Sequence, residues 1–334
     1  MQRFATSVAN EPGKGILVCS CRGNEAKLSR IHAQYPLKFV PTRSYASRLA
    51  VVYMLSYGGG IVSGDTFDIQ LEINPQAILL LLTQGNTKIF KDRAHQRQWM
   101  ASIAQESQPS LPFSSLLPDS KTVPGQKISL QKITADISPT ATLLLLPDPV
   151  TSFRDSSFQS RQTFRLADPS SQLVLLDWFT SGRLTRGENW SFKHYSSRID
   201  VWMGQRLILK DHMVLEDEEY LRTSNSDDAS YASRLRPYTC FATLVIIGSN
   251  GSLLEQCIRN IQEKAEAERL LPNSMQSADA RKLLWSVSPI KKYGVLVRVA
   301  GMTTEKVRDF VKLDCLSHGL QQMVGEGMFS KVLM

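Results

Sequence analysis

The sequence has few cysteines and no long apolar stretch, and both absences narrow the class of protein. Five cysteines in 334 residues form an odd and sparse set, which argues against a disulfide framework. The longest apolar runs, such as Ile78–Leu82 and Leu143–Leu146, are far too short to cross a bilayer. Residues 1–15 lack the apolar segment of a signal peptide. We therefore expect a cytoplasmic protein without a membrane partner.

The usual motifs of nucleotide, nucleophile and metal sites are also missing. No Gly-Lys-Ser or Gly-Lys-Thr is present, and no Ser or Cys lies in a nucleophile-elbow sequence. No two of the five histidines have the spacing of a metal-ligand pair, and Cys19 and Cys21 have no ligand partners nearby. Because a catalytic triad assembles in space, spacing alone does not exclude an enzyme. We expect no catalysis, and a β-fold hydrolase stays open as an alternative.

The chain carries a moderate positive charge. With 39 Lys and Arg against 31 Asp and Glu, the formal net charge is +8, which suits an acidic partner or simply solubility. The basic residues are scattered, without a long basic block or a nucleic-acid-binding motif. We therefore do not expect nucleic-acid binding, and a polyanion-binding protein is the third hypothesis.

A strand–turn–strand pattern recurs three times in the first two thirds of the chain. Asp65–Ile73 alternates apolar and polar residues, as in a half-buried strand. Asn74-Pro75-Gln76 then predicts a turn, and the apolar run Ala77–Leu82 predicts a fully buried strand. The later copies are Lys127–Asp136 with Ala141–Leu146, and Gln162–Ala167 with Gln172–Leu176. The pattern indicates a mainly β protein of stacked strand–turn–strand layers, resembling a β-solenoid or sandwich.

Composition divides the chain into two portions. Residues 1–235 are expected to form a β-rich core, with a Ser-, Pro- and Gln-rich insertion near 94–127. Within this core, Trp190–Tyr195 is also predicted as a strand. Residues 236–334 are expected to form a β-α-β-α portion that packs on the core.

The elements of that second portion follow from its local patterns. They are a strand at Thr239–Ile247, a helix opened by a capping box at Ser252 and running to about Leu270, a strand at Gly294–Val299, and a helix at Thr304–Gln322.

A glycine cluster, Gly58-Gly59-Gly60-Ile61-Val62-Ser63-Gly64-Asp65, is the most distinctive local sequence. Glycines after a strand can bind phosphate, but such a loop needs a following helix, and a strand pattern follows here. We interpret the cluster as a turn in which Gly59, Gly60 and Gly64 serve backbone conformation.

Four segments in order resemble the UreD (UreH) family of urease accessory proteins. They are the glycine cluster up to Asp65, the segment Thr83-Gln84-Gly85-Asn86-Thr87-Lys88-Ile89-Phe90, the segment Leu146-Pro147-Asp148 with Phe153, and Gly182-Arg183 with Gly187-Glu188. The insertion resembles eukaryotic, fungal-like members. The resemblance implies a maturation scaffold rather than an enzyme. It would bind apo-urease and a UreF-like protein and help to pass nickel from a UreG-like GTPase to the urease active site, with no stably bound cofactor and nickel present only transiently.

The resemblance also implies which residues matter, as motif positions or as members of a nickel route through a polar interior. These are Gly59, Gly60, Gly64, Asp65, Thr83, Gln84, Thr87, Lys88, Asp148, Asp177, Gly182, Arg183, Gly187 and Glu188. The route is assigned to the four carboxylates in this set, which adjoin apolar strands or family motifs and would stay hydrated in a water-filled passage. In the alternative interpretation they cap turns or form ion pairs. No metal ligand is assigned.

Overall fold

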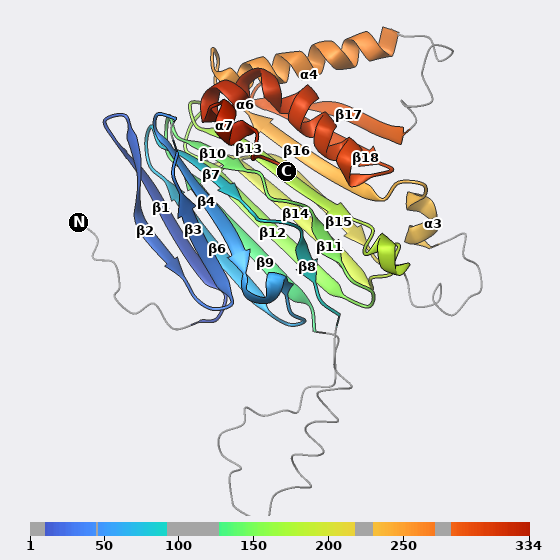
Figure 1. The fold of residues 1–334 in the computed structure, drawn as a ribbon. Coiled ribbons are helices and arrows are strands. Elements are labelled where there is room, and N and C mark those ends of the chain that lie inside the picture. The colour runs from blue at the N-terminus through green and yellow to red at the C-terminus, as the bar shows by residue number, and fades with distance from the viewer. Residues whose placement is uncertain (1–10, 45, 92–126, 218–229, 271–281) are drawn as a thin grey trace, which may run out of the picture.

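The computed structural model describes residues 11–44, 46–91, 127–217, 230–270 and 282–334. They form two β-sheets, packed face to face, with helices over the second sheet (Figure 1). The first sheet has the strand order β15-β14-β12-β9-β6-β1-β2. The main path of the second sheet is β17-β18-β16-β13-β10-β7-β4-β3. The prediction of a mainly β fold is confirmed.

Strand bounds in the first sheet are β1 Lys14–Arg22, β2 Glu25–Ala33, β6 Thr66–Ile73, β9 Ser129–Ile137, β12 Ser157–Leu166, β14 His194–Met203 and β15 Arg206–Leu215. Those in the second sheet are β3 Leu37–Thr42, β4 Leu49–Ser56, β7 Ile78–Leu82, β10 Thr142–Leu145, β13 Gln172–Thr180, β16 Cys240–Ile247, β17 Leu283–Ile290 and β18 Gly294–Gly301. The short strands β5 Gly60–Ile61, β8 Thr87–Ile89 and β11 Val150–Ser152 lie beside this path.

The three repeats stack as the sequence pattern predicts. In each repeat the first strand (β6, β9 or β12) lies in the first sheet, and the second strand (β7, β10 or β13) lies in the second sheet. Equivalent strands are parallel neighbours, which is the arrangement of a β-solenoid. Because no register shift interrupts the pairing within these two sets, equivalent side chains form straight rows across the strands.

The connecting turns stack as well. Each is closed by a backbone hydrogen bond between residues three apart, such as Ala77 N to Asn74 O at 3.1 Å. Neighbouring turns are then joined through hydroxyl groups: Gln76 N donates to Thr140 Oγ1 (3.1 Å), and Thr140 N donates to Ser170 Oγ (2.9 Å). The Asx/Ser-Pro turns therefore bind the layers to each other and satisfy backbone donors that a bare turn would leave to solvent.

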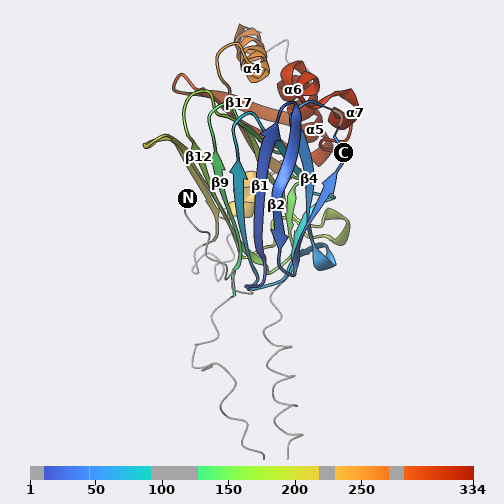
Figure 2. The ribbon, with the colours of Figure 1, turned by 90° about the vertical axis from the view of Figure 1, so that its left-hand side faces the viewer.

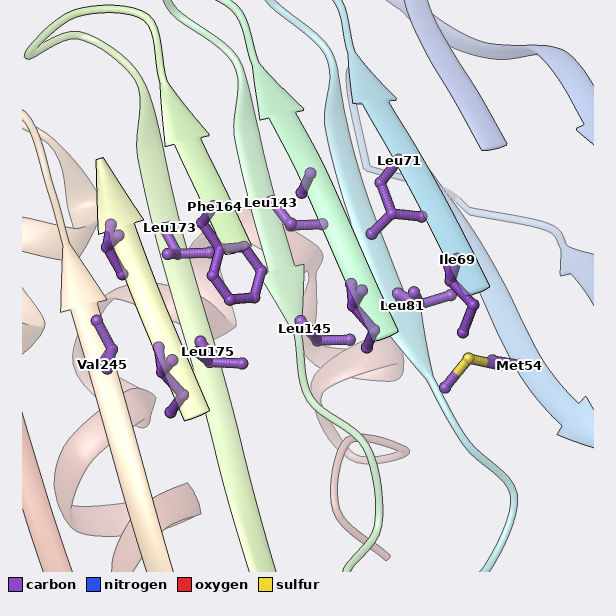
Figure 3. Packing of buried hydrophobic residues seen from close by; sticks show 14 of the residues in the cluster. Met54, Ile69, Leu71, Leu81, Leu143, Leu145, Phe164, Leu173, Leu175 and Val245 are labelled. Carbon is purple, nitrogen blue, oxygen red and sulfur yellow. The ribbon is translucent and has the colours of Figure 1, made fainter. Parts of the chain in front are cut away.

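Two apolar layers stabilise the sandwich. Alternate residues of the second sheet point inward, and those of β7, β10 and β13 form leucine rows such as Leu81–Leu145–Leu175 that face Ile69 and Phe164 of the first sheet (Figure 3). The intervening residues point outward and pack against the helices in a second cluster. This explains why β7 and β10 are apolar on both faces while β6 and β9 alternate.

The C-terminal portion extends the second sheet and covers its outer face (Figures 1 and 2). The helices are α3 Tyr231–Leu235, α4 Leu253–Leu270, α5 Thr304–Asp309, α6 Ser317–Val324 and α7 Glu326–Phe329, and a π-helical segment joins α5 to α6. The start of α4 agrees with the predicted capping box, because Ser252 Oγ accepts a hydrogen bond from Glu255 N.

Three local predictions need correction. The β-α-β-α order omits strand β17, whose alternating pattern lies at the free edge beside β18, so the order is β-α-β-β-α. The predicted strand at Trp190–Tyr195 begins only at His194, because Trp190 has φ of 53° and cannot be extended. The helix predicted at Thr304–Gln322 contains the π-helical segment Phe310–Leu316 and ends at Val324.

The predicted insertion near 94–127 lies outside the described residues, apart from its last position. None of the helices in the described part of the chain is both long and apolar enough to span a bilayer.

The glycine cluster forms a turn between strands, as the sequence predicts. Gly59 and Gly64 have φ of 74° and 86°, in the left-handed region that favours glycine. Gly60 has an extended backbone, and a different constraint applies to it. A Cβ at Gly60 would lie 2.2 Å from the backbone oxygen of Lys88, its partner in the β5–β8 pair. Gly60 is therefore required by close approach of two strands rather than by its torsion angle.

We expect Gly60→Ala to destabilise the protein by about 3 kcal/mol, because the added carbon forces β5 away from β8. Gly58→Ala is the matched control. Gly58 has φ of 80° and open space around its Cβ position, so only the left-handed strain of about 1 kcal/mol applies. Chemical denaturation of both variants measures the difference. Equal losses of stability in Gly60→Ala and Gly58→Ala would show that β5 and β8 can move apart without an energetic cost.

Candidate functional site

A polar row interrupts the apolar interior of the sandwich. In the first sheet, Gln131 of β9, Ser160 of β12 and Ser197 of β14 pair side by side in register. All three occupy inward positions, because the residues two away on each strand, such as Ile133 and Ile199, belong to the core between the sheets. The row therefore places amide and hydroxyl groups in the interior, beside neighbouring rows that are mostly aliphatic and aromatic.

Asp177 faces this row from the second sheet. On β13 it occupies an inward position between Leu175 and Phe179, which both belong to the core between the sheets. Its carboxylate accepts a hydrogen bond of 2.5 Å from Ser197 Oγ of the opposite sheet. The side chain lies deep among protein atoms, yet the residue keeps part of its surface accessible. A carboxylate in this position needs donors or water.

Burial raises the pKa of Asp177 to about 6, and the charge of Asp211 acts in the same direction. Hydrogen bonds from Ser197 and Gln162 oppose the rise. The phenol of the fully buried Tyr195 has its pKa raised by burial and by the Asp177 charge. Its hydroxyl has no hydrogen-bond partner among the described residues. These are the properties of a polar pocket whose remaining hydrogen bonds are left for water.

A narrow cavity connects Asp177 with a second carboxylate, Asp148. Its volume is about 30 Å³, which is room for about two water molecules. The lining side chains that bear polar groups are Thr83, Thr87, Gln131, Asp148, Ser160, Gln162, Asp177 and Trp178. Asp148 accepts hydrogen bonds from Gly85 N (2.7 Å) and Thr83 Oγ1 (3.4 Å). Burial raises the pKa of Asp148, and these hydrogen bonds partly oppose the rise.

An open groove of about 320 Å³ is lined in part by residues of β8 and β11 and by the last residue of β13. Its lining includes Lys88, Gly182 and Arg183. A chain of hydrogen bonds lies along its wall, from Asn86 Nδ2 to Thr151 Oγ1 (3.0 Å) and from there to Thr180 Oγ1 (3.0 Å). Thr180 lies three residues after Asp177 on β13, so the two side chains point to opposite faces of the second sheet, and the groove lies on the other side of this strand from the polar row.

Glu188 holds the wall of the groove in shape. It forms a two-point ion pair with Arg183, and it accepts a hydrogen bond from Arg154 N at 3.3 Å. The Arg183 guanidinium also lies over the ring of Phe153, 3.8 Å from its centroid. The hydrogen bonds from Arg183 lower the pKa of Glu188. Its surroundings are those of a structural ion pair, which was the alternative interpretation of these carboxylates.

The motif residues therefore separate into groups. Thr83, Thr87, Asp148 and Asp177 line the cavity, and Lys88, Gly182 and Arg183 line the groove. Gly59, Gly60, Gly64 and Asp65 belong to the glycine turn, Gln84 is exposed, and Gly187 ends the short 3-10 helix Leu184–Arg186 in a left-handed conformation. Asp65 is not among the residues that line the cavity.

Sequence reasoning missed Gln131, Ser160, Gln162 and Ser197. The signal for them was present, because each is a polar residue in the apolar phase of an alternating strand. In the described part of the chain, no three His, Cys, Asp or Glu side chains are grouped to hold a metal ion.

The pKa of Asp177 makes stability depend on pH in a defined direction. A carboxyl group with a pKa near 4 in the unfolded chain and about 6 in the folded protein binds an extra proton in the folded state between these values. The contribution of Asp177 to the free energy of unfolding therefore falls as pH rises from 4 to 6. We therefore compare the free energy of unfolding of Asp177→Asn with that of the parent. The variant should be more stable relative to the parent at pH 7 than at pH 4, by about 3 kcal/mol. Urea denaturation at both pH values measures it, and a pH-independent difference would contradict the raised pKa.

We expect Glu188→Gln to destabilise the protein by about 2 kcal/mol, because the amide leaves the partly buried Arg183 without its counter-charge. Asp136→Asn is the control, since the Asp136–Arg165 pair is more than half exposed on both sides and should contribute less than about 1 kcal/mol. Thermal unfolding compares the two. Equal, small losses would show that the Glu188 ion pair is not structural.

Comparison with known proteins agrees with the motif analysis. The sequence model described as UreD urease accessory protein matches residues 11–318. The chain is 30% identical over 332 residues to urease accessory protein 4 of Cryptococcus neoformans var. grubii, covering 96% of this chain and 95% of that protein. It is 28% identical over 319 residues to urease accessory protein D of Arabidopsis thaliana, covering 89% and 94% of the two chains. The resemblance inferred from the four motifs is thereby confirmed, and the chain belongs to the UreD family of urease accessory proteins.

Proposed function

We propose that this protein is a scaffold for urease maturation that binds apo-urease and a UreF-like protein and gives nickel, delivered by a UreG-like GTPase, a path toward the urease active site. The names of its relatives support the role in urease maturation. The family consists of accessory proteins and not enzymes, so the hydrolase alternative is discarded. The cytoplasm, where nickel enzymes of this kind could be assembled, is the compartment that we propose.

The main support for a nickel path is that two carboxylates, Asp148 and Asp177, line one internal cavity. An isolated ionised carboxylate is costly to bury in an apolar sandwich, and Asp148 and Asp177 both have a raised pKa because of burial. A water-filled passage would hydrate them, and a passing divalent cation would stabilise their charged forms. The amide of Gln131 and the hydroxyl of Ser160, which line the cavity from the polar row, would supply further oxygen contacts.

The same donor set suits transport better than storage. Nickel binds imidazole and thiolate groups strongly, and neither lines the cavity. Two carboxylates with neutral oxygen groups would hold the ion weakly, and weak binding permits release to the next site. Asp65 and Glu188, which the sequence also assigned to the route, lie in the glycine turn and in an ion pair, so we restrict the internal route to Asp148 and Asp177.

The test is reconstitution of urease with the Asp177→Asn variant. Asparagine keeps the size of the side chain and removes its charge. We expect the variant to co-purify with apo-urease and the UreF-like protein, while the nickel content of the matured urease falls several-fold. Glu25→Gln, which removes the same charge at an exposed position on the edge strand β2, is the control and should leave the nickel content unchanged.

Two results would overturn parts of the proposal. Normal nickel loading by both Asp177→Asn and Asp148→Asn would rule out the route and leave the scaffold role. Failure of the unmodified protein to co-purify with apo-urease would rule out the scaffold role itself.

A further inference from the structure

The outer face of the first sheet is a broad exposed surface in the described structure. The described helices that cover a sheet pack on the second sheet, where their apolar residues form one cluster with the outward side chains of its strands. On β9, β12 and β14 the outward positions alternate with core residues and include exposed Lys132, Arg161 and Arg198. The first sheet thus presents its polar side chains directly to solvent.

These three cations form one row. Arg161 pairs in register with Lys132 on one side and with Arg198 on the other, and Arg198 pairs with His212 of β15. Neighbouring strands are about 4.8 Å apart, so the three permanent charges span about 10 Å. Like charges directly opposite each other on adjacent strands repel, so the row disfavours the isolated fold.

The carboxylates nearby balance the ends of the row but not its centre. Lys132 lies 3.4 Å from Asp68, and Arg198 lies 2.7 Å from Asp200. Arg161 donates to the amide oxygen of Gln159 (3.0 Å), and within the described residues it has no carboxylate at ion-pair distance. The guanidinium of Arg161, at the centre of the row, therefore lacks a counter-charge among the described residues.

We propose that the row formed by Lys132, Arg161 and Arg198 is a docking surface for an acidic segment of a partner protein. Two carboxylates one helical turn apart lie about 6 Å from each other, which fits within the 10 Å of the row once the long side chains adjust. The guanidinium of Arg161 offers a planar, two-point donor for one of them. Such a segment would relieve the repulsion within the row as well as add new ion pairs.

The surrounding charges favour a protein segment over a nucleic acid. Asp68, Glu72, Asp136 and Asp200 also point outward on this face. A continuous polyphosphate crossing the sheet would lie over these carboxylates and be repelled. A protein segment can place a few carboxylates over the row and neutral or basic residues over its acidic rim.

The experiment uses the full-length protein and two fluorescently labelled probes of equal charge. One is a helical peptide with glutamates one turn apart and neutral residues at its other positions, and the other is a single-stranded oligonucleotide. We compare Arg161→Glu with Lys27→Glu, which makes the same change of charge at an exposed position on β2, at the far edge of the same sheet. We expect the parent to bind the peptide more tightly than the oligonucleotide. We also expect Arg161→Glu to weaken peptide binding about tenfold, and Lys27→Glu to change it less than about twofold.

If Arg161→Glu and Lys27→Glu weaken peptide binding equally, net charge and not the row attracts the peptide. Tighter binding of the oligonucleotide than of the peptide would contradict a protein partner.

A second variant guards against misfolding of Arg161→Glu. Arg161→Gln should raise the melting temperature at low salt by relieving repulsion, and the gain should shrink as salt is added. An unchanged or lower melting temperature at low salt would show that the row is not repulsive.

Discussion

The unshifted register of the parallel strands is the constraint on which the rest of the structure depends. β6, β9 and β12 pair without a bulge, as do β7, β10 and β13, because the stacked turns that join them repeat the same hydrogen bonds. Every side chain on one strand therefore lies beside its equivalent on the next. Leucine rows build the interior of the second sheet, and the polar residues Gln131, Ser160 and Ser197 form a row across three strands of the first sheet.

This register explains how an apolar sandwich accommodates a charge. A single buried carboxylate would be costly, but Asp177 faces a whole row of polar side chains and reaches Ser197 across the gap between the sheets. The same cavity includes Asp148, from the segment after β10. On the opposite side of the first sheet, the alternation of the same strands aligns the cations of the outer face. The in-register pairing of the strands therefore aligns both the polar side chains of the interior and the cations of the outer face.

Much of the fold could be predicted from the sequence because its repeats use strong local signals. The alternating strands, the Asx/Ser-Pro turns and the apolar second strands are all found where the pattern places them. Strand β17 was missed, and Trp190 was assigned to a strand although its backbone turns there. For the candidate site, a family motif pointed to Asp148 and the apolar run before it pointed to Asp177, but neither signal separated these two carboxylates from Glu188. The difference is tertiary: Glu188 meets Arg183, whereas Asp177 meets a row whose members come from three strands distant in sequence.

The central claim is that the polar row and its two carboxylates form a hydrated passage inside the sandwich. A crystal structure at a resolution that shows ordered water, from crystals soaked in a nickel salt, tests it most directly. The account predicts ordered water that contacts both Asp148 and Asp177, with partially occupied nickel identified beside these carboxylates by its anomalous scattering. A dry cavity, with both carboxyl groups satisfied by protein donors alone and no nickel signal near them, would contradict it.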